Sequence, residues 1–290
     1  MNLLADLVTM SFPHATEAVC LAMAIQGSLA VRNGPNKNRT MHWFHAFVKS
    51  TLTAYAGATF TNIFMGRPTA MLANDIFFGA CLLGYALVNC TPFNVGYMVL
   101  NSPPGELVIT VLSQVFRVGG IVGFSDAAFT MFRDSPSPYY DVPVFGPILF
   151  PSVLGNMGGF FFGGLDGYLE KGMPWLFQQG ISCSTFYHFY AHDTTGIIGT
   201  TLRSILKPTI AIPFMKLMGA TDDEQINDDT QFAKVAVGVF MVLMAVLRMP
   251  MVLGVKFSPF EVVGDAVLMP WKKSKKKVDV KPKKSKKKTQ

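Results

Sequence analysis

Residues 105–132 read GELVITVLSQVFRVGGIVGFSDAAFTMF, and only Glu106, Arg117 and Asp126 in this stretch carry an ionisable carboxylate or guanidinium. A helix needs roughly 20 mostly apolar residues to cross the hydrocarbon core of a bilayer. The stretch exceeds that length and keeps its few charges apart. It therefore predicts a membrane-spanning helix.

Six further apolar segments of similar length surround this one. They lie at about 13–31, 43–65, 70–90, 143–168, 190–215 and 231–253. The segment at 190–215 is the most interrupted, because it contains Arg203, Lys207 and Pro208. Together the seven segments predict an all-α membrane protein with seven transmembrane helices.

The composition agrees with a membrane protein and divides the chain in two. Half of the 290 residues are hydrophobic and 15% are charged, with a mean hydropathy of +0.34, which is too apolar for an ordinary soluble domain. Residues 272–290 hold 11 of the 25 basic residues, so the rest of the chain is slightly acidic. We expect a seven-span transmembrane domain at 1–271 and a disordered, lysine-rich tail at 272–290.

The tail predicts a location but no nucleic-acid partner. A nucleic-acid binder would carry its basic residues on a folded face, whereas these lie in a terminal run. The final Lys287-Lys288-Thr289-Gln290 has the form of a di-lysine retrieval signal of the endoplasmic reticulum. Attraction to anionic cytosolic lipid, at roughly 1 kcal/mol per basic residue near the surface, is the alternative reading of the tail.

The distribution of basic residues predicts the orientation. Lys and Arg in short loops favour the cytosolic side of a membrane. Basic residues follow the first span at 32–39, and the lysine-rich tail follows the seventh, while the acidic run at 222–229 follows the sixth. An odd number of spans places the two basic segments on one face. We therefore expect a luminal N-terminus and a cytosolic C-terminus.

Glycines in the second and fifth spans indicate one of two features. Gly57 lies in the second span, and six glycines, among them Gly158 and Gly159, crowd residues 155–167 of the fifth. Small residues allow close helix packing in membranes, but they also permit broken helices whose freed carbonyls line a polar pathway. If spans one to three and four to six are repeats, the two glycine-bearing spans correspond, and the repeats are inverted.

Ionisable residues inside the spans are candidates for function because their burial in a membrane is costly. Arg117 lies near the middle of the fourth span, and Asp126 lies in the same span. The cost of burying a guanidinium falls if it pairs with an acid, lines water or contacts a lipid phosphate. We expect Arg117, Asp126, Gly57, Gly158 and Gly159 to contribute to a pore or its gating.

Evidence for catalysis is poor, and we expect a protein that is not an enzyme. His188 and His192 have the spacing of a metal-binding pair before Asp193, but the glutamate of a metalloprotease helix is missing. The four cysteines lack the spacing of a zinc or redox motif. No catalytic residue and no metal site are predicted, although an intramembrane enzyme with His188, His192 and Asp193 remains an alternative.

Several segments, taken in order, carry a resemblance to a known family. They are SQVFR at 113–117 with VGGIVG at 118–123, WF at 43–44 with Gly57 and GRP at 66–68, 85–93 with Cys90 and Pro92, Gly158-Gly159 with Lys171-Gly172, and FSPFE at 257–261. The chain thereby resembles the trimeric intracellular cation channels, as a divergent, type B-like member. Ser113 and Gln114 stand where the family's span-four motif has Lys and Glu, and only Arg117 keeps a charge of that motif.

The resemblance implies more than the residues alone predict. It implies seven spans built as two inverted three-helix repeats plus a seventh helix, and a homotrimer with a pore in each protomer. It also implies a potassium-permeable channel of the endoplasmic or sarcoplasmic reticulum that supplies counter-ion current during calcium release. An inositol phospholipid (PIP2) held by Ser113, Gln114 and Arg117 is implied as well. A secondary transporter is the alternative, since inverted repeats with discontinuous helices are equally a transporter pattern.

Overall fold

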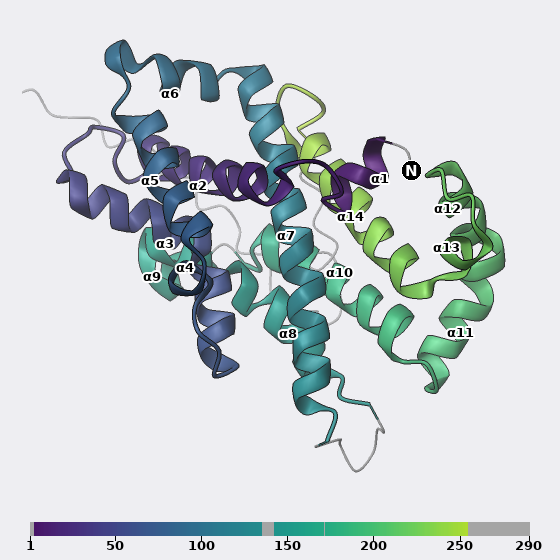
Figure 1. The fold of residues 1–290 in the computed structure, drawn as a ribbon. Coiled ribbons are helices and arrows are strands. Elements are labelled where there is room, and N and C mark those ends of the chain that lie inside the picture. Colours follow the sequence, from purple (N-terminus) through teal and green to yellow (C-terminus); the bar gives the residue numbers. More distant parts are fainter. Residues whose placement is uncertain (1–2, 135–141, 171, 255–290) are drawn as a thin grey trace, which may run out of the picture. The chain divides into compact units, whose positions relative to one another are not determined.

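The structure is a computed structural model that describes residues 3–134, 142–170 and 172–254. Every regular element in these ranges is a helix, as the sequence predicted (Figure 1). The lysine-rich tail at 272–290 and the FSPFE segment at 257–261 lie outside the described residues, so the expectations for them stay predictions.

The helices follow one another with short connections. In the first half they are α1 (Leu3–Val8), α2 (Ala15–Asn33), α3 (Trp43–Phe64), α4 (Ala70–Ala73), α5 (Asp75–Asn89), the 3₁₀ turn η1 (Pro92–Asn94), α6 (Val95–Leu100) and α7 (Pro103–Phe132). In the second half they are α8 (Phe145–Ser152), the 3₁₀ turn η2 (Leu154–Gly159), α9 (Phe160–Leu169), α10 (Trp175–Tyr187), the π-helical turns η3 (His188–His192) and η4 (Lys207–Ala211), α11 (Ile197–Leu206), α12 (Ile212–Leu217), α13 (Asp223–Asn227) and α14 (Asp229–Arg248).

Most predicted spans correspond to helices. The first, second, fourth and seventh are α2, α3, α7 and α14, and the third is divided into α4 and α5 at Asn74. The fifth is broken into α8, η2 and α9, in agreement with a discontinuous helix. Its break lies at η2, which contains Gly155, Gly158 and Gly159.

The predicted sixth span at 190–215 is wrong as a single helix. The chain leaves the helical conformation between η3 and α11, at residues 193–196. The helix that packs against α7, α8 and α14 is instead α10, which continues into η3. Its residues 175–189 had been assigned to no span.

Two described helices, α7 and α14, are long and apolar enough to cross a membrane, and the pair formed by α5 and residues 92–100, bent by 86°, would add a third. The chain is thus a multi-pass membrane protein. The full count of seven spans and their arrangement as inverted repeats remain predictions.

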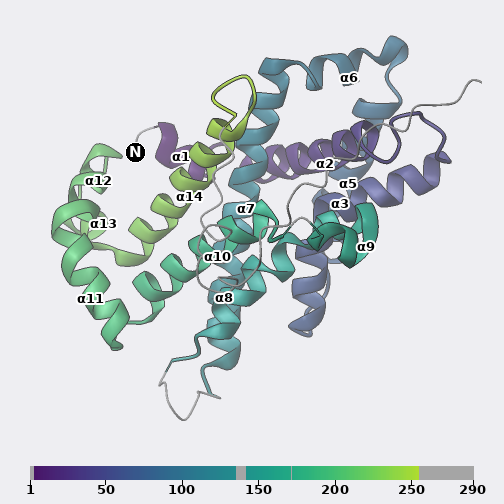
Figure 2. The same ribbon diagram turned by 180° about the vertical axis from the view of Figure 1, so that it is seen from behind.

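Helix α7 joins the two groups of helices. It packs against α2 in the first half and against α8, α10 and α14 in the second. In both ribbon views α7 runs between the group α2, α3 and α5 and the group α10 to α14 (Figures 1 and 2). The largest buried apolar cluster lies in the second group and includes Tyr187, Tyr190, Phe232 and Met241.

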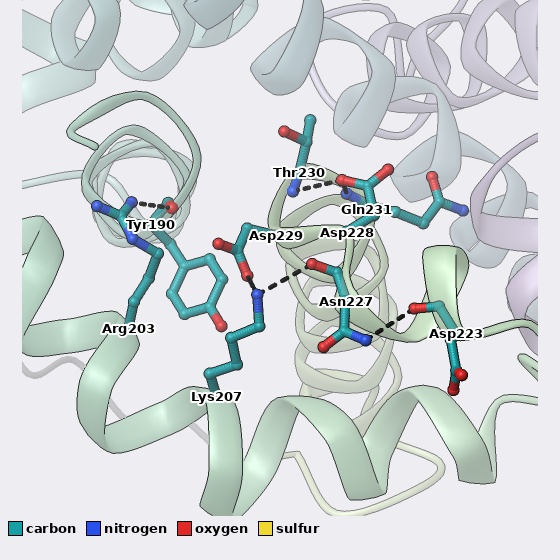
Figure 3. A network of polar contacts seen from close by, with 9 residues as sticks. All are labelled: Tyr190, Arg203, Lys207, Asp223, Asn227, Asp228, Asp229, Thr230 and Gln231. Carbon is teal, nitrogen blue, oxygen red and sulfur yellow. Dashed lines mark hydrogen bonds and ion pairs between the residues drawn. The ribbon is translucent and has the colours of Figure 1, made fainter.

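Local sequence signals set the starts of α7 and α14, the two described helices that are long and apolar enough to cross a membrane. Ser102 precedes Pro103 and Pro104, and its hydroxyl accepts a hydrogen bond from the backbone N–H of Gly105 at 3.4 Å. Proline fits the first turn of a helix because its missing N–H has no partner there in any case. The carboxylate of Asp228 accepts from the N–H groups of Thr230 and Gln231 and so caps α14 (Figure 3).

The side chain of Arg32 stabilises the sharp bend in the chain after α5. Phe93 and Asn94 have φ angles of 51° and 60°, in the left-handed region, and turn the chain there. Arg32, at the end of α2, donates to the carbonyl oxygen of Val88 and to Oδ1 of Asn94, and its guanidinium lies over the ring of Tyr97 at 3.8 Å. The guanidinium therefore ties α5 and α6 to α2.

Candidate functional site

A cavity of about 530 Å³ lies among α2, α3, α7 and η2, and we call it the Arg117 cavity. These four elements supply most of the lining, and α4, α5, α8 and α10 add one residue each. The contribution of α7 includes Arg117, Gly120, Ile121 and Phe124, which recur at helical spacing and so share one face. The polar side chains of the described lining are Thr16, Gln26, Thr53, Asn62, Arg117 and Asn156.

The guanidinium of Arg117 is the feature that distinguishes this cavity. Its Nη2 donates to Oε1 of Gln26 at 3.4 Å, while the buried Nε and Nη1 have no hydrogen-bond partner within the described part of the chain. Among the described lining residues none is acidic. A buried cation with unused donors favours an anionic or strongly polar group beside it. The cavity therefore has positive electrostatic character.

The broken fifth segment forms one wall of the cavity. Asn156, at φ −117° and ψ 18°, interrupts the helical path inside η2. Its side-chain amide donates to the carbonyl of Ser152 at 2.7 Å, and its own carbonyl accepts from the hydroxyl of Tyr168 at 3.1 Å. These two bonds satisfy backbone groups that the break releases, as membrane depth requires.

The glycines bring α3 and η2 together. A Cβ built on Gly57 would lie 1.9 Å from the carbonyl oxygen of Gly155, and one on Gly158 would lie 2.3 Å from that of Thr53. A Cβ on Gly159 would lie 2.2 Å from the ring of Tyr168. All three predicted glycines line the Arg117 cavity. Close packing and helix breakage therefore occur in the same place.

Of the two uses of glycine that the sequence leaves open, helix breakage does not occur at Gly57. Helix α3 continues through Gly57 from Trp43 to Phe64. Gly57 is required here for close approach: its missing side chain leaves room for the backbone of η2. The break lies in η2 alone.

Asp126 lies away from the cavity, in a polar cluster between α7 and α10. Its Oδ1 accepts from the hydroxyl of Tyr187 at 2.8 Å and is 2.9 Å from Nε2 of His192. The ring of Phe129 stacks on His192 with 4.4 Å between centroids. The structure thus separates Asp126 from the other four predicted pore residues and gives it a role in helix packing.

Two of the three residues of the enzyme alternative lie together, because the rings of His188 and His192 are 5.6 Å apart between centroids, but the carboxylate of Asp193 is bonded elsewhere. His192 contacts Asp126, whereas the carboxylate of Asp193 accepts from the N–H groups of Gly196 and Gly199 at 2.8 and 3.0 Å. His188 is fully buried, and neither of its ring nitrogens has a partner within the described residues. No group of metal-ligating side chains is found in the described part of the chain. Asp193 holds the start of α11.

Ser113 and Gln114 do not join Arg117 at the cavity. Both side chains are buried, and the hydroxyl of Ser113 donates to the carbonyl of Thr110 in its own helix at 2.9 Å. Neither residue belongs to the cavity lining. The three residues expected to hold a lipid headgroup are therefore not assembled on one wall.

Sequence reasoning missed the neutral polar residues of the lining. Gln26 and Asn156 were not singled out, because an amide carries no charge and its cost in a membrane is small beside that of an arginine. A signal was present for Gln26: it lies mid-way along α2 among apolar residues. An uncharged polar residue in the middle of an apolar helix is therefore a candidate for function, as a charged residue is.

A second polar network joins α11 to α14 and lies apart from the cavity. Lys207 contacts Oδ1 of Asp229 at 2.8 Å and the carbonyl of Asn227 at 3.0 Å (Figure 3). Arg203 donates to the carbonyls of Tyr190 and Asp193 at 2.8 and 2.6 Å. The network holds the 197–227 segment against the neighbouring helices.

The helices and their cavity define a polytopic membrane protein with a discontinuous helix beside a buried arginine. No protein-family model matches the sequence, and the curated protein sequences contain no match.

The fold is that of the trimeric intracellular cation channels. A structure of such a channel from C. elegans without Ca²⁺ has a TM-score of 0.54 and 16% identity, over 84% of this chain and 94% of that chain. A structure of such a channel from C. elegans with bound Ca²⁺ has a TM-score of 0.51 and 15% identity, over 84% and 97%. The resemblance predicted from the ordered motifs is confirmed at the level of the fold.

Proposed function

We propose that this protein is a monovalent cation channel with potassium as its permeant ion. The observation that carries the proposal is the Arg117 cavity, which lies beside the discontinuous α8–η2–α9 segment in a fold shared with cation channels. A broken helix lined by backbone and neutral polar groups is a means of passing an ion through a membrane. The conducting unit is a homotrimer with one such pathway in each protomer.

The positive charge of Arg117 has to be neutralised before a cation passes. A guanidinium binds phosphate strongly, and two nitrogens of Arg117 have no partner within the described residues. We therefore propose that the phosphate of an inositol phospholipid contacts Arg117. Because Ser113 and Gln114 lie outside the cavity lining, the guanidinium supplies the main contact.

The sequence supports a location in the reticulum membrane. The lysine-rich tail and its terminal Lys287-Lys288 favour a cytosolic C-terminus with a retrieval signal. The N-terminus is then luminal if the span count is odd. In that membrane a potassium conductance supplies counter-ion current during calcium release.

A secondary transporter is the second candidate, and the broken fifth segment favours it equally. Discontinuous helices beside a midplane cavity are typical of transporters that alternate access. The two functions differ in flux. A channel gives ohmic current, while a transporter gives saturable exchange.

The test is the reversal potential of purified protein in a planar bilayer under a potassium chloride gradient. A cation channel gives a reversal potential near that of potassium, and the sign inverts if chloride carries the current. Efflux of labelled potassium from vesicles of the same lipid shows whether the flux saturates as the potassium concentration rises. A chloride-like potential contradicts cation selectivity, and saturable exchange without single-channel steps supports the transporter.

A further inference from the structure

The side chain of Gln26 faces that of Arg117 across the cavity. Gln26 lines the cavity together with Met23, Gly27 and Ala30, which share its face of α2. Its Oε1 accepts from Nη2 of Arg117 at 3.4 Å. This distance is at the long end for a hydrogen bond, so the contact is weak and breaks readily.

The backbone that carries Gln26 is fixed on two sides. A Cβ on Gly27 would lie 2.7 Å from the carbonyl oxygen of Ser50 in α3, and a Cβ on Gly84 in α5 would lie 2.8 Å from Cβ of Ala24. Helix α2 is therefore clamped between α3 and α5 next to Gln26. A rigid backbone presenting one polar group is the arrangement that positions a partner side chain accurately.

Arg117 depends on this amide because it has no other hydrogen-bond partner among the described residues. Its Nε and Nη1 have none within the described residues, and no described acid lines the cavity. The direction of the guanidinium inside the cavity is thus set by one neutral acceptor. A neutral acceptor holds a cation less strongly than a carboxylate would.

We propose that Gln26 is a positioning residue for Arg117: its Oε1 holds the guanidinium toward α2, and loss of this bond lets the charge move along the cavity. The inference rests on the proposed channel function and adds to it the residue that sets the resting place of the charge. Gln26 acts through Arg117 and does not itself need to contact the permeant ion.

The substitutions Gln26→Leu and Gln26→Glu change the contact in opposite directions. Leucine keeps most of the side-chain volume and removes the acceptor, whereas glutamate replaces it by a carboxylate that pairs with the guanidinium. We expect the two variants to shift open probability in opposite directions, each by roughly three- to tenfold, the range for one ordinary hydrogen bond, because the contact is long. Ser204→Ala, on the exposed face of α11, is the control for changes unrelated to the cavity.

A double-mutant cycle on the full chain, with currents recorded in planar bilayers, tests whether Gln26 acts through Arg117. In an Arg117→Leu background, Gln26→Leu should have no further effect, because the partner it positions is absent. Equal effects of Gln26→Leu with and without Arg117 overturn the inference while leaving the channel intact.

The cycle also separates failure of the inference from failure of the channel function. Absence of current from the unmodified protein overturns both. Thermal unfolding of the same four proteins then shows whether the Gln26–Arg117 contact exists independently of conduction. Coupled melting temperatures support the contact, and additive ones contradict it.

Discussion

The α-carbon of Gly57 lies so near the backbone of Gly155 that a Cβ on Gly57 would stand 1.9 Å from the carbonyl oxygen of Gly155. This contact joins an unbroken helix, α3, to the broken segment that faces it. At this point of the lining of the Arg117 cavity, the backbones of α3 and η2 touch with no side chain between them.

The substitution Gly57→Ala should destabilise the protein. The added methyl group would force α3 away from η2, and overpacking of this kind costs about 1–3 kcal/mol. Thermal unfolding in detergent measures the loss. Gly79→Ala is the matched control, because a Cβ there meets nothing within 4 Å. Equal melting temperatures for the two variants would show that the helices can separate freely.

The substitution Arg117→Ala should change open probability or its dependence on lipid while leaving the trimer assembled. The side chain lines a cavity within one chain and is held by one weak hydrogen bond, so its loss removes little folding energy. Recordings with and without inositol phospholipid, together with size measurement of the purified protein, check the expectation. Unchanged currents in both lipid conditions would refute a role for the guanidinium.

The substitution Asp126→Asn should weaken the packing of α7 against α10. The carboxylate accepts from Tyr187 and faces His192, and since its side chain is 43% exposed, we expect a loss of only about 1 kcal/mol in the free energy of unfolding. Tyr187→Phe removes one of the two contacts. A smaller combined loss than the sum of the single losses would confirm that the residues act as one cluster, and strict additivity would argue against it.

The substitution Asp193→Ala should loosen the start of α11 without abolishing conduction. The N–H groups of Gly196 and Gly199 would lose their acceptor, at a cost of about 1–3 kcal/mol. Hydrogen exchange at 196–199 should rise. A complete loss of function with unchanged exchange would instead revive a chemical role for this carboxylate.

The apolar helices were predictable because length and hydropathy alone identify them. Helices α7 and α14 are long and apolar enough to cross a membrane. The predicted limits 105–132 agree closely with α7, whereas α14 ends at Arg248, before the predicted limit at residue 253. The sequence singles out Arg117 because a charge stands out against an apolar background, and the side chain lines the cavity; its part in gating stays a prediction.

Helix α10 was missed because its polar residues are satisfied inside the protein. Gln179 donates to the carbonyl of Met241 at 3.2 Å, and the hydroxyl of Ser184 contacts the carbonyl of Ile148 at 3.0 Å. Hydropathy cannot anticipate such bonds, since they depend on which helices become neighbours. Composition alone therefore does not predict this helix.

The role of Gly57 was not predictable for a different reason. Glycine both breaks helices and allows close contact, and the sequence does not distinguish the two uses. Only the position of Gly155 opposite Gly57 decides between them. The same limit applies to Gln26, whose importance depends on a residue far away in the chain.

The polar network around α11 contains two basic residues, Arg203 and Lys207, which lie four positions apart. Arg203 binds carbonyls at the end of the helix formed by α10 and η3, and Lys207, one turn later, binds Asp229 at the start of α14. One residue inserted between them would turn Lys207 by roughly 100° about the helix axis. One helical turn can therefore link the end of one helix to the start of another. This link depends on the spacing of four residues more than on the identity of either side chain.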